Sequence, residues 1–207
     1  YLGRFVVYSP DGVYFDKTQK LQREDVPAAG GVVEVAEGAF DVDEHGVIAV
    51  GVLQRLADLV NAVNSIIHSK TFDNGMICAT EQTVIADQEV YDLVKDEFMK
   101  RGCYFLNEKE KDLIRKTMLI NGALNAKIVG QRPVTIAKMA GFEVPDDTKV
   151  LIGEATSTDT SEAFGHEKLT TILGMYKSKD FDDALNIAEA LLVNNGGLGH
   201  TTPFRAR

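Results

Sequence analysis

Cys78 is the residue whose type and setting are best suited to chemistry. It is one of two cysteines in 207 residues, and it follows the turn-forming run Asp73-Asn74-Gly75. A thiol on an irregular segment beside regular structure can be held in place and reached, as covalent catalysis requires. Because most lone cysteines are small buried side chains, position alone favours a packing role. Cys103 lies in an apolar run and is expected to be buried.

The elements that must position Cys78 fall into two parts, residues 1–53 and residues 54–207. The first part has short apolar runs separated by Gly, Pro and Asp, which predicts a strand-rich region. These runs are Phe5–Tyr8, Val13–Phe15, Val32–Val35 and Val47–Val50. In the second part, helix and strand patterns alternate. This predicts an α/β domain with a mostly parallel sheet flanked by helices.

Helix and strand signals surround Cys78 on both sides. An apolar stripe with helical spacing runs from Leu56 to Ile67, directly before the Cys78 segment. Asp87 is expected to cap a helix that stops at Gly102, and Asn107 to cap the next helix, which ends near Met118. Further helices are expected at 134–140 and 181–193, and strands at 83–86, 103–106, 127–130, 149–152 and 170–176.

The composition argues against several classes of function. A net charge of −9 disfavours nucleic-acid binding, although backbone N–H groups can still bind a phosphorylated cofactor. No run of eighteen apolar residues predicts a membrane span, and no secretory signal is visible. Sparse cysteine usage indicates a reduced, cytoplasmic setting, and the His and Cys spacing predicts no metal site. The first residue is Tyr1, which indicates a fragment, a processed chain or the ordered part of a longer one.

The run SKTFDNGMICATEQ, residues 69–82, resembles the nucleophile segment of CoA-acylating aldehyde dehydrogenases. The nearest resemblance is to the aldehyde dehydrogenase part of bifunctional aldehyde-alcohol dehydrogenases. Further similar motifs follow in order to about residue 202, at 120–125, 128–131, 143–154, 164–169 and 196–201. Residues 1–53 show no such match, because Asp43–Ile48 stands where the family has a glycine-rich segment. They are a divergent region, a shifted reading frame or a piece of another module.

This resemblance implies that Cys78 is the catalytic nucleophile. Its thiolate would attack an aldehyde to form a hemithioacetal, which would become a thioester as hydride passes to NAD. Coenzyme A would then accept the acyl group. The reaction requires a thiolate, and backbone amides near residues 74–78 would favour it and also bind the oxyanion.

Three residues of the run Glu162–His166 are implied to contact cofactors. Glu162 would accept hydrogen bonds from the nicotinamide ribose of NAD, and Phe164 would pack beside the nicotinamide. His166 would lie near the active site or face CoA. In the alternative interpretation, Glu162 is a solvated acid at a helix start and His166 is a hydrogen-bonded structural histidine.

The segment Gly196–Thr201 is implied to approach the substrate or cofactor. Gly197 and Gly199 would allow close contact with the backbone, and His200 would act as an acid or base. The alternative is a helix end followed by a turn.

The cofactor lobe of the family is not visible in this chain. In the family a Rossmann-like lobe precedes the nucleophile and supplies most NAD contacts, yet no Gly-x-Gly-x-x-Gly fingerprint is present. We therefore expect weak or no NAD binding, and no complete dehydrogenase activity, from this chain alone. The resemblance implies a small aldehyde substrate and a homo-oligomer or a larger bifunctional chain. The alternatives are a non-catalytic oligomerisation module and NAD-independent thioester chemistry at Cys78.

Overall fold

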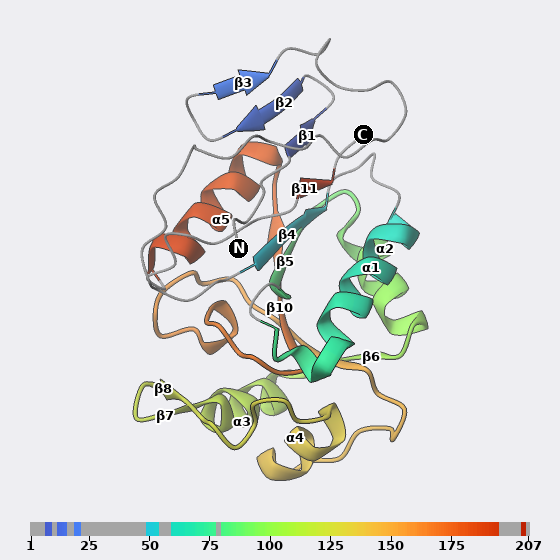
Figure 1. Ribbon diagram of the computed structural model, residues 1–207, viewed down its shortest axis with the longest axis vertical. Helices are drawn as coiled ribbons and strands as arrows, with labels where there is room; N and C mark the ends of the chain where they lie inside the picture. Colours follow the sequence, from blue (N-terminus) through green and yellow to red (C-terminus); the bar gives the residue numbers. More distant parts are fainter. Residues whose placement is uncertain are drawn as a thin grey trace.

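The computed structural model describes residues 59–77 and 80–194 in full, and the backbone of strands at 7–9, 12–15, 19–21, 49–53 and 204–205. One sheet has the strand order β11-β4-β5-β10-β9-β6, and all its described pairs are parallel. Its strands are β4 Ala49–Leu53, β5 Glu81–Asp87, β6 Cys103–Phe105, β9 Val150–Glu154, β10 Ile172–Ser178 and β11 Phe204–Arg205. The predicted α/β class is therefore confirmed (Figure 1).

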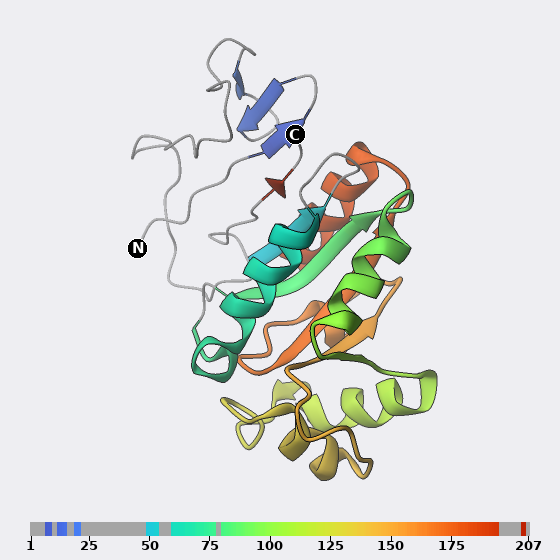
Figure 2. The same cartoon turned by 90° about the vertical axis from the view of Figure 1, so that its right-hand side faces the viewer.

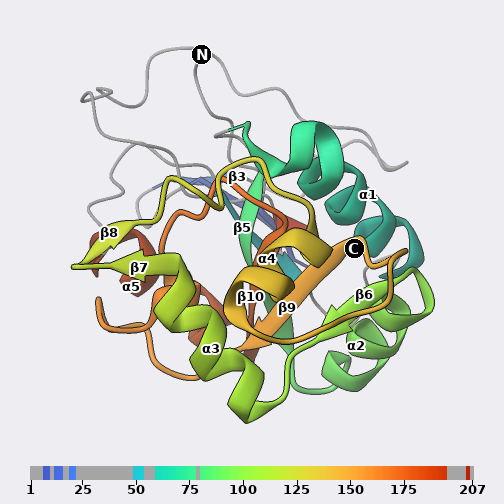
Figure 3. The ribbon, with the colours of Figure 1, turned by 90° about the horizontal axis from the view of Figure 1, so that it is seen from below.

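Helices cover both faces of this sheet. Helices α1 (Leu59–Thr71) and α2 (Tyr91–Lys100) lie side by side on one face (Figure 2). Helix α5 (Phe181–Asn194) packs on the opposite face. Helices α3 (Glu108–Met118) and α4 (Pro133–Ala140) lie next to each other at one end of the sheet (Figure 3).

Alternate residues of the central strands divide between two apolar clusters. Val84 and Ala86 of β5 pack with α1 and α2, whereas Ile85 packs with α3, α4 and α5. The same alternation holds in β9, where Ile152 faces the first cluster and Leu151 the second. Strands buried on both faces are typical of parallel sheets covered by helices. Burying such a side chain stabilises the fold by about 1.5–3 kcal/mol, so this sheet is a rigid platform for neighbouring segments.

The predicted strand-rich region is only partly described. Strands β1 (Val7–Ser9), β2 (Gly12–Phe15) and β3 (Gln19–Leu21) form an antiparallel sheet. The expected run Val32–Val35 lies outside the described residues. Strand β4 pairs with β5, so the proposed division between residues 53 and 54 falls inside the β4–α1–β5 unit. Where the second domain begins stays a prediction.

Helix boundaries with strong local signals agree with the sequence. Asn107 forms a capping box with Glu110: its side chain accepts from the Glu110 N–H, and the Glu110 carboxylate accepts from the Asn107 N–H. Pro133 is the first residue of α4, where its missing N–H removes no helical hydrogen bond. Gly141 caps the end of α4.

The strand predicted at residues 127–130 is wrong. These residues form turns, because the Asn125 side chain accepts from the Lys127 N–H and the Asn125 carbonyl accepts from the Ile128 N–H. Such local hydrogen bonds compete with a strand ladder. The chain instead forms a short hairpin just before this point, with β7 (Leu119–Ile120) paired to β8 (Ala123–Leu124).

The role predicted for Asp87 is also wrong. Asp87 ends β5, and its carboxylate accepts from the Glu89 N–H within a turn. The following helix begins at Tyr91, with Val90 as its first flanking residue. An aspartate makes the same local hydrogen bond in a turn as at a helix start, so the sequence signal was ambiguous.

Candidate active site

The segment that leads to Cys78 leaves α1 through a short 3₁₀ turn, η2 (Phe72–Gly75). Asp73 and Asn74 have φ angles of +48° and +50°, and Gly75 follows at +76°. The left-handed region costs roughly 1–2 kcal/mol for a residue with a Cβ. Strain of this kind persists only where surrounding contacts enforce it, and it is concentrated at functional sites.

Contacts of Gly75 hold this turn against the chain before β10. A Cβ at Gly75 would lie 2.5 Å from the carbonyl oxygen of Thr170 and 3.1 Å from that of Lys70. Only glycine therefore combines this backbone conformation with this close approach. The contact joins the end of α1 to a segment about a hundred residues later in the chain.

Residues before and after Cys78 are also held in place, by a packing contact and by a backbone hydrogen bond. Met76 packs against Gly130, whose N–H donates to the Leu169 carbonyl over 3.0 Å. The N–H of Thr80 donates to the Ile77 carbonyl over 3.0 Å. Cys78 itself, with Ala79, lies outside the described residues. Its predicted role as nucleophile is therefore not tested by geometry.

Apolar side chains on this segment face solvent. Phe72 is 67% exposed, Met76 44% and Ile77 40%. These three residues lie within six positions and therefore provide exposed apolar area close in sequence to the candidate nucleophile.

Three buried polar side chains come from elements next to this segment in the chain or in contact with it, and we call them the lysine–glutamine cluster: Lys70, Gln82 and Lys168. All three are 0% exposed. The Nζ of Lys70 donates to Oε1 of Gln82 over 3.2 Å. The Nζ of Lys168 donates to the carbonyl oxygens of Gln82 over 2.9 Å and His166 over 2.7 Å. The Lys168 N–H also donates to Oε1 of Gln82, so one amide oxygen serves both lysine residues.

Burial dominates the electrostatics of this cluster. It lowers the pKa of Lys70 to about 7, which the charges of Glu81 and Glu167 offset only in part. Burial, together with the positive charge of Lys70, lowers the pKa of Lys168 well below its usual range. Burial also raises the pKa of Glu167, which is half-buried beside the two amines. An ammonium group removed from water costs several kcal/mol, which is why burial disfavours the charged form of both lysines.

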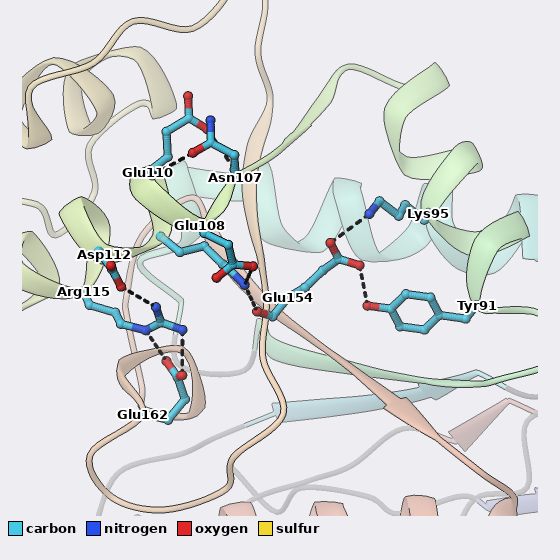
Figure 4. Close-up of polar contacts among 10 residues, drawn as sticks. Tyr91, Lys95, Asn107, Glu108, Glu110, Asp112, Arg115, Glu154 and Glu162 are labelled. Atoms are coloured by element: carbon cyan, nitrogen blue, oxygen red, sulfur yellow. Dashed lines mark hydrogen bonds and ion pairs between the residues drawn. The ribbon is translucent and has the colours of Figure 1, made fainter.

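Glu162 is engaged by Arg115 of α3 in a bidentate ion pair. Nε of Arg115 donates to Oε1 over 3.1 Å, and Nη2 donates to Oε2 over 2.9 Å (Figure 4). The Glu162 carboxylate also accepts from the Phe164 N–H and so caps the short turn η3 (Ala163–Gly165). The pair fixes the segment between β9 and β10 to α3. The role of Glu162 toward NAD stays a prediction.

Phe164 is fully buried in the cluster formed with α3, α4 and α5. Its ring lies against Gly153 of β9, and the Arg115 guanidinium lies 5.4 Å from the ring centre. No part of this ring is exposed to a cofactor in the structure. Its predicted contact with nicotinamide also stays untested.

Replacing Glu162 with glutamine should lower the unfolding free energy by about 1.5–3 kcal/mol, because it removes charged hydrogen bonds that are only 10% exposed at the glutamate. Asp112 is the matched control, since it pairs with the same Arg115 but is 68% exposed. Asp112→Asn should cost less than about 0.5 kcal/mol. Urea denaturation measures both values, and equal losses would contradict the structural role of Glu162.

The other sequence-predicted residues are divided between described and undescribed parts of the chain. The ring Nε2 of His166 lies 2.6 Å from the Thr160 carbonyl, a hydrogen bond that requires a proton on that nitrogen. This contact fits the structural alternative, and a role toward CoA stays a prediction. Gly197, Gly199 and His200 lie outside the described residues.

Cys103 is buried, as predicted, with 6% of its surface exposed. Burial raises the pKa of its thiol to about 12. It is therefore inert at neutral pH and provides an internal reference for the reactivity of Cys78.

A second polar network lies at the carboxyl end of β9. The Glu154 carboxylate accepts from the Tyr91 hydroxyl and from Nζ of Lys95, both over 2.8 Å (Figure 4). The Glu154 backbone carbonyl accepts from Nζ of Lys111 over 2.9 Å. This network joins α2 and α3 across the sheet edge.

Within residues 59–77 and 80–194, no group of three or more His, Cys, Asp or Glu side chains is arranged to hold a metal ion. Over the described chain, no helix has the length and apolar character needed to span a membrane.

The lysine–glutamine cluster was not recognised from the sequence, although one signal was available. Lys70 continues the apolar stripe Val63, Ile66 and Ile67 at helical spacing, so it occupies a core position of α1. A lysine at such a position is rarely buried without a function or a partner. Gln82, Lys168 and Glu167 gave no comparable signal, because only the fold brings them to Lys70.

Comparison with known proteins relates this geometry to a family. No protein-family model matches the chain. The aldehyde-alcohol dehydrogenase of Clostridium acetobutylicum is 45% identical over 192 residues, which cover 90% of this chain and 22% of that protein. The bifunctional aldehyde-alcohol dehydrogenase of Escherichia coli K12 is 52% identical over 151 residues, which cover 73% of this chain and 17% of that protein.

A solved structure shows similarity to the same kind of enzyme. The crystal structure of an acetylating aldehyde dehydrogenase from Geobacillus thermoglucosidasius matches with a TM-score of 0.75 and 42% identity, over 78% of this chain and 35% of that chain. The chain spans about a fifth of the length of the two curated relatives. Since the Clostridium match covers 90% of the chain, it reaches into residues 1–53, which favours a divergent region over an unrelated module. The resemblance seen in the Cys78 segment is confirmed: the chain is homologous to aldehyde-alcohol dehydrogenases, is similar in structure to acetylating aldehyde dehydrogenases, and corresponds to part of their length.

Proposed function

We propose that this chain carries the nucleophile of a CoA-acylating aldehyde dehydrogenase, with Cys78 as the residue that holds the acyl group. The observation that carries the proposal is the match of the Cys78 segment to relatives at 45–52% identity. The strained turn at Asp73–Gly75 and the buried polar cluster beside the same segment support it, because both features are typical of functional sites.

In this mechanism the Cys78 thiolate attacks the carbonyl carbon of a small aldehyde. The exposed apolar side chains of Phe72, Met76 and Ile77 provide contact area for the alkyl part of the substrate. In the second half-reaction, the CoA thiol attacks the thioester on Cys78, and the Cys78 thiolate is the leaving group. His200 is proposed to transfer the proton of the incoming thiol.

NAD, when bound, accepts the hydride that converts the aldehyde adduct into the thioester. The described residues do not fit a complete NAD site. Both oxygens of Glu162 bind Arg115, and Phe164 is fully buried. These two residues therefore take no part in the proposed steps, and we expect NAD to bind this chain weakly or not at all.

Acyl transfer can be tested without NAD, by running the second half-reaction in reverse. The folded chain is incubated with acetyl-CoA, digested and analysed by mass spectrometry. One acetyl group is expected on Cys78 and none on Cys103, because burial keeps the Cys103 thiol protonated. Calorimetric titration of the chain with NAD should show no tight binding.

The outcome also distinguishes the alternative functions. A folded chain whose Cys78 stays unmodified by acetyl-CoA would contradict the proposal and favour a non-catalytic oligomerisation module. Tight binding of NAD would contradict the expectation that this chain lacks a complete cofactor site.

A further inference from the structure

Met76 lies where three segments of the chain meet: η2, the turn around Gly130, and the segment just before β10. The Met76 side chain fills the space beside Gly130, because a Cβ at Gly130 would lie 2.6 Å from the Met76 sulfur. Gly130 has a φ of +67°, so both its backbone conformation and this contact favour glycine. We call the three segments, residues 72–76, 128–131 and 169–171, the η2 junction.

The other two pairs of segments in the η2 junction are also in contact. Gly75 at the end of η2 lies against the carbonyl group of Thr170. The N–H of Gly130 donates to the Leu169 carbonyl over 3.0 Å. Each segment therefore contacts the other two, and the Met76 sulfur provides one of these three contacts.

The η2 junction holds strained backbone in place. Asp73 and Asn74 of η2 have positive φ angles, and so does Leu169, at +47°. A residue with a Cβ keeps this conformation only where surrounding contacts enforce it, because the left-handed region is unfavourable for it. Loss of one contact of the junction should therefore allow its segments to relax toward unstrained conformations.

The Met76 side chain is also partly open to solvent. The chain has five methionines. Met76 is 44% exposed, which matches Met99 of α2 at 45% and Met139 of α4 at 43%, whereas Met118 and Met175 are buried. Exposure therefore divides the methionines into three that a small oxidant reaches and two that it does not.

We propose that Met76 is an oxidation site, and that its oxidation by a peroxide opens the η2 junction. The thioether sulfur attacks one oxygen of hydrogen peroxide, an S–O bond forms, the O–O bond breaks and water leaves. Sulfur loses two electrons and the peroxide gains them. The resulting sulfoxide is polar, so it disrupts the apolar contact with Gly130. Methionine sulfoxide reductases reverse this modification, which makes the opening reversible.

The first part of the test maps the oxidised residues. The folded chain is treated with hydrogen peroxide, digested and analysed by mass spectrometry. The three exposed methionines should each gain one oxygen, and the two buried ones should not. If Met76 stayed unoxidised in a folded chain whose Met99 and Met139 were oxidised, the inference would be overturned.

The second part measures opening of the junction by amide hydrogen exchange before and after treatment. The Gly130 N–H, which donates to Leu169, should exchange about tenfold faster after treatment, equivalent to about 1.4 kcal/mol less protection. In Met76→Leu the treatment should leave this exchange unchanged, because leucine has a similar volume and is not oxidised. Met99→Leu and Met139→Leu are the matched controls, and both should still show the faster exchange.

Two exchange results would contradict the inference. One is an unchanged Gly130 exchange rate in a chain whose Met76 is oxidised. The other is an equal acceleration in treated Met76→Leu. All of these chains contain Cys78, so oxidation of its thiol does not account for a difference among them. The experiment uses neither acetyl-CoA nor NAD and does not depend on the role of Cys78, so its outcome is independent of the proposed function.

Discussion

Replacing Cys78 with serine is expected to slow acetyl exchange between acetyl-CoA and isotopically labelled CoA by about 10³-fold or more. A serine hydroxyl has nearly the same shape but is almost never ionised near neutral pH, so it is a far weaker nucleophile without an activating base. The exchange measures formation and breakdown of the acyl-enzyme, and it needs no hydride transfer. Label in acetyl-CoA is followed by mass spectrometry, with the protein-free rate subtracted.

The control for this prediction is the second cysteine. Cys103→Ala removes a thiol that burial keeps protonated, and it should change the exchange rate by less than about twofold. If Cys78→Ser retained the exchange rate and Cys103→Ala lost it, the assignment of the nucleophile would be wrong. Loss in both variants would indicate unfolding, which circular dichroism detects separately.

Replacing Phe164 with alanine is expected to lower the unfolding free energy by about 3–5 kcal/mol. The ring is fully buried against Gly153 and beside the Arg115 guanidinium, so its removal leaves a cavity and also loses a cation–π contact. Phe164→Leu retains most of the volume and should cost less, about 1.5 kcal/mol or below. Urea denaturation of the unaltered chain, Phe164→Ala and Phe164→Leu measures the three unfolding free energies.

A double-mutant cycle identifies Gly153 as the partner of this ring. In the unaltered chain, Gly153→Ala should be destabilising by about 1–3 kcal/mol, because its Cβ would overlap the Phe164 ring. In the Phe164→Ala background, the same change should cost much less, since the overlapping atoms are gone. If the losses of unfolding free energy from the two substitutions were additive, the contact between Gly153 and the Phe164 ring would be contradicted.

The elements that could be predicted from the sequence are those whose signals lie within a few residues of each other. Asn107 as a helix cap and the apolar stripe of α1 each predict an element that the structure contains. Gly141 likewise marks the end of α4. The prediction failed at Asp87 and at residues 127–130, where side-chain hydrogen bonds to the local backbone formed turns instead.

The candidate site was predictable only where it is continuous in the chain. The Cys78 segment has a recognisable pattern over residues 69–82, and that pattern identified the family. The pattern did not show that Arg115 would bind Glu162, because the two residues are 47 positions apart and meet only through the packing of α3. It did not show Lys168 either, since a lysine in a polar sequence is normally solvated.

The contact between Gln82 and Lys168 sets an order of events during synthesis. The two residues are 86 positions apart, so translation at 5–20 residues per second separates them by roughly 4–17 s. During this interval β5 lacks its neighbour β10, which is made after Lys168. One edge of β5 is therefore unpaired in a nascent chain of this length. An unpaired strand edge can pair with other chains, so the unfinished protein is open to misassembly until the strand that completes the sheet has been made.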